Sequence, residues 1–131
     1  MDMIYKVKTE KVFDVAVKAL IDSCAEVGFG VLWQLNFKDK LHEKGLAFED
    51  NFMILEVCNP VKAQKVLLEN REMGFFLPCK VAVFELEGGV YIGMPKPTEL
   101  MAVAGGAGLN EIALEVENAL KSAIDKAASA V

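Results

Sequence analysis

The stretch at residues 79–86, CKVAVFEL, constrains the fold most, because it is apolar on both faces of a strand. Successive side chains of a strand point to opposite sides. One face would carry Cys79, Val81 and Val83, and the other Ala82, Phe84 and Leu86. A strand with two apolar faces lies inside a sheet that is covered on both sides. We therefore predict a central strand here, and expect any face that the helices leave open to be covered by something else.

The other periodicities predict strands alternating with helices. Two-residue alternation predicts strands at 3–8, 28–37, 52–58 and 90–94, and helical spacing predicts helices at about 10–27, 60–71 and 110–128. Glu87, Gly88 and Gly89 would form the loop of a hairpin. Parallel strands need a helix that crosses over between them, and the predicted helices are too few to connect all the strands in this way. Together with the hairpin, this favours one α+β domain over residues 1–131. Its sheet is predicted to be largely antiparallel and packed on helices.

Four local details belong to this prediction. Thr9 is expected to cap the first helix, and Cys24 to lie in the apolar stripe of that helix as a core residue. In the strand at 28–37, alternate residues are apolar and are expected to share one face: Phe29, Val31, Trp33, Leu35 and Phe37. The run GGAG at residues 105–108 is expected to be a linker before the last helix.

Charge and composition argue against several classes of partner. The net charge is −5, which repels phosphate backbones, so we expect no nucleic-acid partner. No apolar run approaches the roughly 18 residues of a membrane span, so we expect no membrane insertion. The first residues read as a strand without the apolar core of a signal peptide, which favours the cytoplasm. The three cysteines are an odd number, which argues against a structural disulfide framework.

Cys58, Asn59 and Pro60 form a corner between a predicted strand and a predicted helix. Asn59 is a good helix cap and Pro60 a good first helical residue, so both have a structural explanation. Cys58 precedes the cap, where helix amides stabilise a thiolate, although Glu56 on the same strand face would oppose this. Cys79 follows a second proline. Whether Cys58 and Cys79 form a working pair or simply fill a corner and the core depends on the strand order, which the sequence leaves open.

The sequence favours no metal or cofactor. His42 is the single histidine and lies among charged residues, as expected for a solvent-exposed side chain. A zinc site needs about four ligands at close spacing, whereas the three cysteines are far apart and no C-x-x-C occurs. The residues contain no complete catalytic set and leave open whether the protein is an enzyme.

Three segments resemble a known family. GFGVLWQLNFKDKLHEKG, LEVCNP and LPCKVAVFE are similar to the uncharacterised prokaryotic family catalogued as domain of unknown function 302, over about residues 4–128. The resemblance implies a β-α-β-β-β-β-α fold similar to a TATA-binding-protein half-domain, with the helix after Pro60 as an insertion, and homodimers. Asn36 departs from the family, since many members have aspartate there. The resemblance implies no reaction.

Two functional hypotheses follow. The first is a small homodimeric binding or accessory protein, whose ligand groove lies at the corner of Cys58, Asn59, Pro60 and Cys79. Helix amides there would favour an anionic or thiol-containing small molecule. The second is a thiol redox or sulfur-transfer protein in which Cys58 reacts and Cys79 is its partner. Substrate, pathway and physiological protein partner are not encoded in these patterns.

Overall fold

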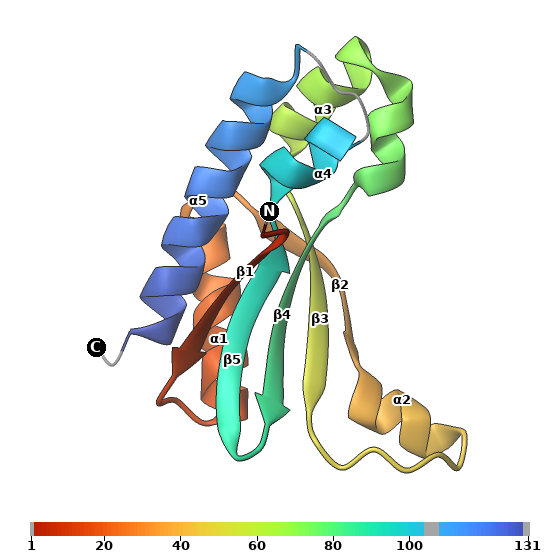
Figure 1. Ribbon diagram of the computed structural model, residues 1–131, viewed down its shortest axis with the longest axis vertical. Helices are drawn as coiled ribbons and strands as arrows, with labels where there is room; N and C mark the ends of the chain where they lie inside the picture. The colour runs from red at the N-terminus through yellow and green to blue at the C-terminus, as the bar shows by residue number, and fades with distance from the viewer. Residues whose placement is uncertain (1, 104–107, 130–131) are drawn as a thin grey trace.

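The computed structural model describes residues 2–103 and 108–129, which form one sheet and its helices (Figure 1). The elements in chain order are β1 (Ile4–Thr9), α1 (Phe13–Glu26), β2 (Gly30–Asn36), α2 (Phe37–Glu43), β3 (Phe52–Cys58), α3 (Pro60–Glu69), the 3₁₀ helix η1 (Arg71–Phe76), β4 (Cys79–Leu86), β5 (Gly89–Pro95), α4 (Pro97–Val103) and α5 (Asn110–Ala128).

The sheet has the strand order β1-β5-β4-β3-β2, and all four neighbouring pairs are antiparallel. The predicted α+β class and the central position of residues 79–86, which form β4, are therefore confirmed. Leaving aside α2, α3, η1 and α4, the element order is the β-α-β-β-β-β-α order that the family resemblance implied. Because α1 connects the two edge strands, it has to cross the whole sheet.

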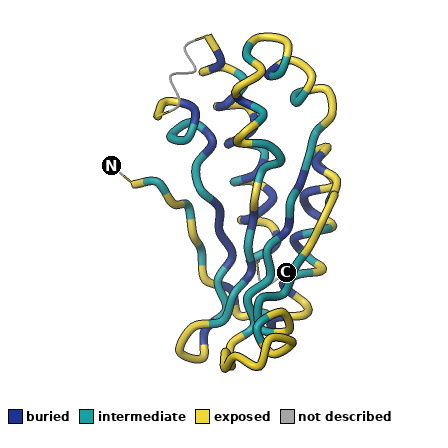
Figure 2. The backbone as a smooth tube through the Cα atoms, turned by 90° about the vertical axis from the view of Figure 1, so that its right-hand side faces the viewer, coloured by how far each residue is buried: buried dark blue, intermediate teal, exposed yellow. Residues whose placement is uncertain are grey.

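One face of the sheet, here called the inner face, packs against α1 and α5 (Figure 1). Buried residues run along these helices and the central strands, while loop ends are exposed (Figure 2). The main core includes Leu20 and Cys24 of α1, Val83 of β4 and Leu120 of α5, all with no exposed surface. The predicted core position of Cys24 is confirmed.

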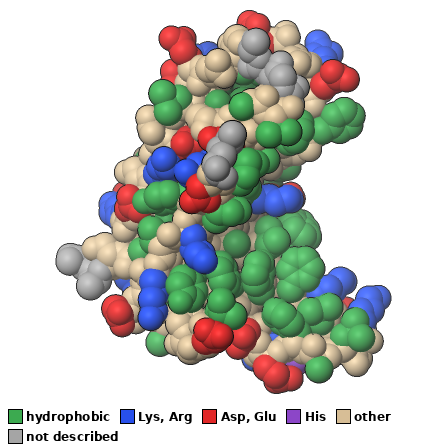
Figure 3. Space-filling view, viewed as in Figure 1, with side chains coloured by type: hydrophobic (Ala, Val, Ile, Leu, Met, Phe, Trp, Pro, Cys, Tyr) green, Lys and Arg blue, Asp and Glu red, His purple; other side chains and the backbone are tan. Residues whose placement is uncertain are grey.

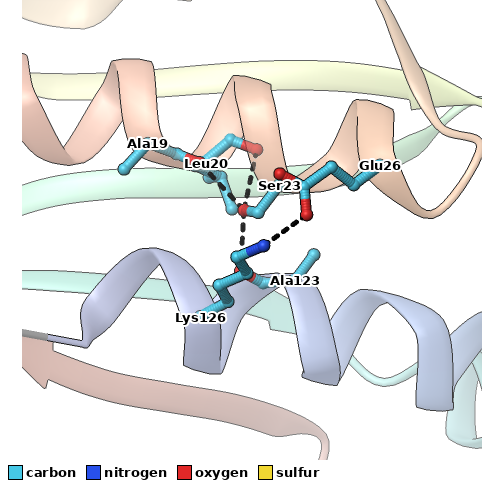
Figure 4. Close-up of polar contacts among 6 residues, drawn as sticks. All are labelled: Ala19, Leu20, Ser23, Glu26, Ala123 and Lys126. Atoms are coloured by element: carbon cyan, nitrogen blue, oxygen red, sulfur yellow. Dashed lines mark hydrogen bonds and ion pairs between the residues drawn. The ribbon is translucent and has the colours of Figure 1, made fainter. Parts of the chain in front are cut away.

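Polar contacts tie the two long helices together over the inner face (Figure 4). The hydroxyl of Ser23 in α1 is buried and donates to the carbonyl oxygen of Ala123 in α5 at 2.8 Å. Lys126 and Glu26 form an ion pair near the surface between the same helices. The buried hydroxyl thus has a partner on the neighbouring helix, which fixes how the two helices sit against each other.

A β-bulge overturns the prediction for the strand at 28–37. The register shifts between Val31 and Trp33, so Val31 lies opposite the buried Val57 whereas Trp33 lies opposite Glu56. Because an extra residue reverses the alternation, Trp33 and Leu35 face away from Val31. Phe37 is not part of the strand and begins α2. The expected single apolar face was therefore wrong.

Three smaller expectations also change. Thr9 ends β1 and donates its hydroxyl to the carbonyl oxygen of Ala128, so it does not cap α1, whose cap residue Val12 has no side-chain hydrogen bond. The hairpin turn has two residues, Glu87 and Gly88, both with positive φ, as a type I′ turn requires. Residues 105–107 of the predicted linker lie outside the described residues. None of the described helices has the length and apolar character needed to cross a membrane.

The other face of the sheet, here called the outer face, carries a row of aromatic rings. Phe37, Phe52, Phe84 and Tyr91 follow one another at centroid distances of 6.2, 5.2 and 5.5 Å. Figure 3 shows hydrophobic side chains gathered over the sheet and α2 on this side. In the view of Figure 1, α1 lies behind the sheet and α5 runs along its left side, so neither helix covers the outer face.

Candidate functional site

A cavity of about 290 Å³ lies at the end of the sheet where β3 leads into α3. Strand residues Val57, Cys79 and Met94 form part of its wall, and α3, η1, α4, α5 and the connections between elements supply the rest. The remaining lining residues are mostly apolar and include Phe29, Ala63, Val66, Phe76, Leu77, Leu100, Met101, Val116 and Leu120. The cavity is partly open to solvent and borders Cys58, Asn59 and Cys79, the corner at which the sequence predicted a ligand groove.

The cavity lies between two separate hydrophobic clusters. Phe29 and Val57 belong to the main core, whereas Val66 and Met101 belong to a second cluster that also contains Met73, Leu109 and Ala113. A core that simply closed up would merge the two clusters, because protein interiors are normally close-packed. The space between them is of the size and apolar character typical of small-molecule sites.

The corner itself is built as the sequence predicted. Asn59 is the cap residue of α3, and its Oδ1 accepts a hydrogen bond from the backbone N–H of Lys62 at 3.2 Å. Pro60 is the first residue of α3 and is exposed. Cys58, Asn59 and Cys79 line the cavity, whereas Pro60 does not. Pro60 therefore starts α3 and does not form part of the cavity wall.

Gly28 links this corner to the end of α1. It has a φ of +87°, and its N–H and that of Phe29 return to the carbonyl oxygens of Ala25 and Cys24, which closes α1. A Cβ atom at Gly28 would lie 2.9 Å from Nδ2 of Asn59. The chain therefore needs a glycine here for two reasons, its backbone angle and the proximity of the Asn59 amide.

The two cysteines at the cavity are free thiols on neighbouring strands. Cys79 lies opposite Val57, and Cys58 is one residue further along β3. In a regular ladder this offset sends their side chains to opposite faces, so direct disulfide pairing would require the end of β3 to turn. Burial, and secondarily the charge of Cys58, raise the pKa of Cys79 to about 11. Cys79 therefore stays a thiol at neutral pH.

The charged groups near the cavity are paired. Nζ of Lys62 lies 2.5 Å from Glu115, and Nζ of Lys80 lies 2.7 Å from Glu56. The hydrogen bond from Lys62, aided by its charge, lowers the pKa of Glu115. Glu56, which the sequence placed near Cys58, thus has its charge offset by Lys80. No Asp, Glu or His is among the described residues that line the cavity.

The other chemical candidates lie elsewhere or have structural roles. His42 is exposed on α2, and its Nε2 is 3.0 Å from the carbonyl oxygen of Phe48. Over residues 2–103 and 108–129, no group of three or more His, Cys, Asp or Glu side chains is placed to hold a metal ion. Asn36, the departure from the family pattern, caps α2 by accepting a hydrogen bond from the N–H of Lys38.

Sequence reasoning missed a buried carboxylate that holds one wall of the cavity. Glu117 of α5 is 5% exposed, and its Oε1 accepts from the backbone N–H and the hydroxyl of Thr98 at 3.0 and 2.6 Å. Burial would raise the pKa of Glu117, but the Thr98 bonds and the nearby Lys121 outweigh it and lower the pKa. The contact fixes the start of α4, which carries Leu100 and Met101 into the cavity wall. The only sequence signal was an acidic residue beside the apolar stripe of α5.

These features define a small α+β protein with an antiparallel sheet, two covering helices and an apolar cavity at one end. The sequence profile described as Domain of unknown function DUF302 matches residues 5–127, and the chain belongs to this family. The fold is also similar to a solved structure of an uncharacterized conserved DUF302 protein from Bacillus stearothermophilus, with 42% identity and a TM-score of 0.93. The match covers 97% of this chain and 99% of the other. No curated protein matches. The predicted family is confirmed, and membership indicates no specific function.

Proposed function

We propose that the protein is a binding or accessory protein that holds a small, mostly apolar molecule in the cavity beside Cys58, Asn59 and Cys79. The observation that carries this proposal is the cavity of about 290 Å³ between two hydrophobic clusters that do not close on each other. The mostly apolar wall of this cavity favours an apolar molecule, whose surface is removed from water when it binds there.

The charges around the cavity favour a ligand without net charge. The sequence alone suggested an anionic or thiol-containing molecule, because helix amides attract negative charge. Here the amide of Lys62 is already bonded to Asn59, and the ammonium groups of Lys62 and Lys80 are paired with Glu115 and Glu56. An anion would have to displace one of these partners, whereas an apolar molecule gains from burial alone.

Thermal denaturation with small neutral apolar molecules, such as alkylbenzenes and medium-chain alcohols, tests the proposal. A ligand that binds only the folded protein raises the melting temperature. The substitution Ala63→Phe should abolish the rise, because Ala63 lines the cavity on α3. Ala25→Phe is the matched control on the exposed side of α1. The proposal fails if no such molecule stabilises the protein, or if the two variants respond alike.

We also propose that the protein is a homodimer joined through the outer face. The aromatic row from Phe37 to Tyr91 and the 46% exposed Trp33 form an apolar surface that α1 and α5 do not cover. Large exposed apolar patches commonly mark contacts between proteins, and symmetric dimers are the commonest assembly. Light scattering should give twice the chain mass for the natural protein and for Val15→Glu, which alters an exposed site on α1. Phe84→Glu should give a monomer, and a monomeric natural protein contradicts the proposal.

The second candidate function is thiol redox or sulfur-transfer chemistry by Cys58 with Cys79 as partner. It is favoured by one observation, that both free thiols border the same cavity. The register offset and the raised pKa of Cys79 weigh against Cys79 as a resolving thiol. Mass spectrometry after mild oxidation decides this point, since the pair requires a disulfide between Cys58 and Cys79. Free cysteines also fit the cytoplasmic location that we propose, where thiols stay reduced.

A further inference from the structure

The described polar groups that line the cavity differ in how far they are already engaged. Asn59 caps α3 through Oδ1, and its amide nitrogen packs against Gly28. Lys62 and Lys80 are held in ion pairs. Cys58 and Cys79 are free thiols. The thiols are therefore the groups that can distinguish one apolar molecule from another by its chemistry.

We propose that the cavity takes an apolar disulfide and that Cys58 retains half of it as a mixed disulfide, with the apolar group seated between the two hydrophobic clusters. This inference rests on the proposed function, since it names the ligand class of the same cavity. Cys58 is the reacting residue because it is half-buried at the end of β3, where the strand leads into α3 and a second molecule can approach. Cys79 is half-buried too, but it lies opposite the fully buried Val57, and burial raises its pKa to about 11, so it stays a thiol.

The reaction is a thiol–disulfide exchange and needs no external oxidant. Cys58 loses its proton to water, and its sulfur attacks one sulfur of the disulfide. A new S–S bond forms to Cys58 as the S–S bond of the ligand breaks. The released thiolate takes up a proton, so one protein thiol and one disulfide give one mixed disulfide and one small thiol. The apolar half remains because the cavity wall shields it from water, as burial favours.

Two neutral disulfides of nearly equal size test the inference. Dipropyl disulfide and bis(2-hydroxyethyl) disulfide differ mainly in carrying methyl or hydroxyl ends. We expect the rate ratio of the first to the second at Cys58 to exceed the same ratio for free glutathione by about tenfold, because burial of the two methyl ends is favourable. Peptide mapping by mass spectrometry assigns the adduct to Cys58, and Cys58→Ser should remove it. A ratio equal to that of glutathione overturns the inference.

Cavity variants separate seating in the cavity from simple reactivity. Ala63→Phe, or the smaller change Ala63→Leu if the first does not fold, should return the ratio to that of glutathione, while Ala25→Phe should leave it high. If the variant at Ala63 keeps the high ratio, as Ala25→Phe should, the inference is wrong. The Cys58→Ser protein is then heated with alkylbenzenes. If alkylbenzenes raise the melting temperature but Cys58 shows no preference for the apolar disulfide, the mixed-disulfide inference is wrong and the proposed function stands. If alkylbenzenes do not raise the melting temperature, the proposed function itself is wrong.

Discussion

The two ends of the inner face of the sheet are packed differently. Towards the β4–β5 hairpin, Val83 and Ile92 have no exposed surface and pack into the main core with α1 and α5. Towards the other end, Val57 has no exposed surface either, yet it borders the cavity. Val57 and Val83 are therefore equally buried but have different surroundings, because the cavity lies beside Val57 and not beside Val83.

This difference indicates that the two ends of the sheet have different roles. The packed end stabilises the fold, since buried apolar contacts there are complete on all sides. At the cavity end, hydrogen bonds hold the elements in place, namely the Asn59 cap on α3 and the Glu117–Thr98 contact on α4. Such an end keeps its shape without being filled, which is what a binding cavity requires. Substitutions at matched positions can test this view.

The largest expected effect is at Val83. Val83→Ala should lower the free energy of unfolding by about 2–3 kcal/mol, because it creates a hole in a close-packed region. Val57→Ala should cost about 1 kcal/mol less, because the space it leaves joins the neighbouring cavity and is not a new enclosed hole. Both residues lie on the inner face of central strands, so strand propensity cancels in the comparison. Urea denaturation measures both values, and equal losses would mean that the two ends are packed alike.

The sequence predicted the packed end better than the cavity end. The strands at 52–58 and 79–86, the central position of β4 and the core role of Cys24 follow from local periodicity, and all were confirmed. The face of Trp33 was missed, because a one-residue bulge reverses a pattern that otherwise looks regular. Cys58, Asn59 and Cys79 were named as part of a ligand groove, but the residues of η1, α4 and α5 that form the other walls of the cavity were not. Its walls come from five regions of the chain, whose fit is not a local property.

A second prediction concerns the closure of α1 against the corner. Gly28→Ala should cost about 2 kcal/mol, combining the strain of a positive φ with the crowding of the Asn59 amide. Gly45 is the matched control, since its φ is +74° and a Cβ there meets nothing within 4 Å. Gly45→Ala should therefore cost only about 1 kcal/mol, the backbone part alone. Chemical denaturation of both variants gives the difference, and equal costs would show that Asn59 gives way freely.

A third prediction concerns the α4 wall of the cavity. The folded protein lowers the pKa of Glu117 below its usual value of 4.5, so its charged form stabilises the fold above that pH. This stabilisation is lost as the pH falls through the lowered folded-state value. Glu117→Gln should cost about 1–2 kcal/mol at neutral pH, because a charged hydrogen-bond acceptor is replaced by a neutral one.

The test is the difference in unfolding free energy between the natural protein and Glu117→Gln, followed from neutral to acid pH. The difference should be constant above 4.5 and shrink below it, since a protonated Glu117 resembles glutamine. Lys121→Met serves as a partial control, because it removes the ion pair with Glu117 but keeps both Thr98 bonds. A difference that does not change with pH would show that Glu117 contributes through its shape alone.

The smallest expected effect is at the helix cap of the cavity corner. Asn59→Ala removes the bond to the N–H of Lys62 and should cost about 1 kcal/mol, whereas Asn59→Ser should restore most of it. Combining each change with Gly28→Ala gives a double-mutant cycle. With alanine at position 59 no amide crowds a Cβ at position 28, so the double variant should be more stable than the sum of the single costs. Strict additivity would mean that the end of α1 and the start of α3 are independent, and that the cavity corner is held by the cap alone.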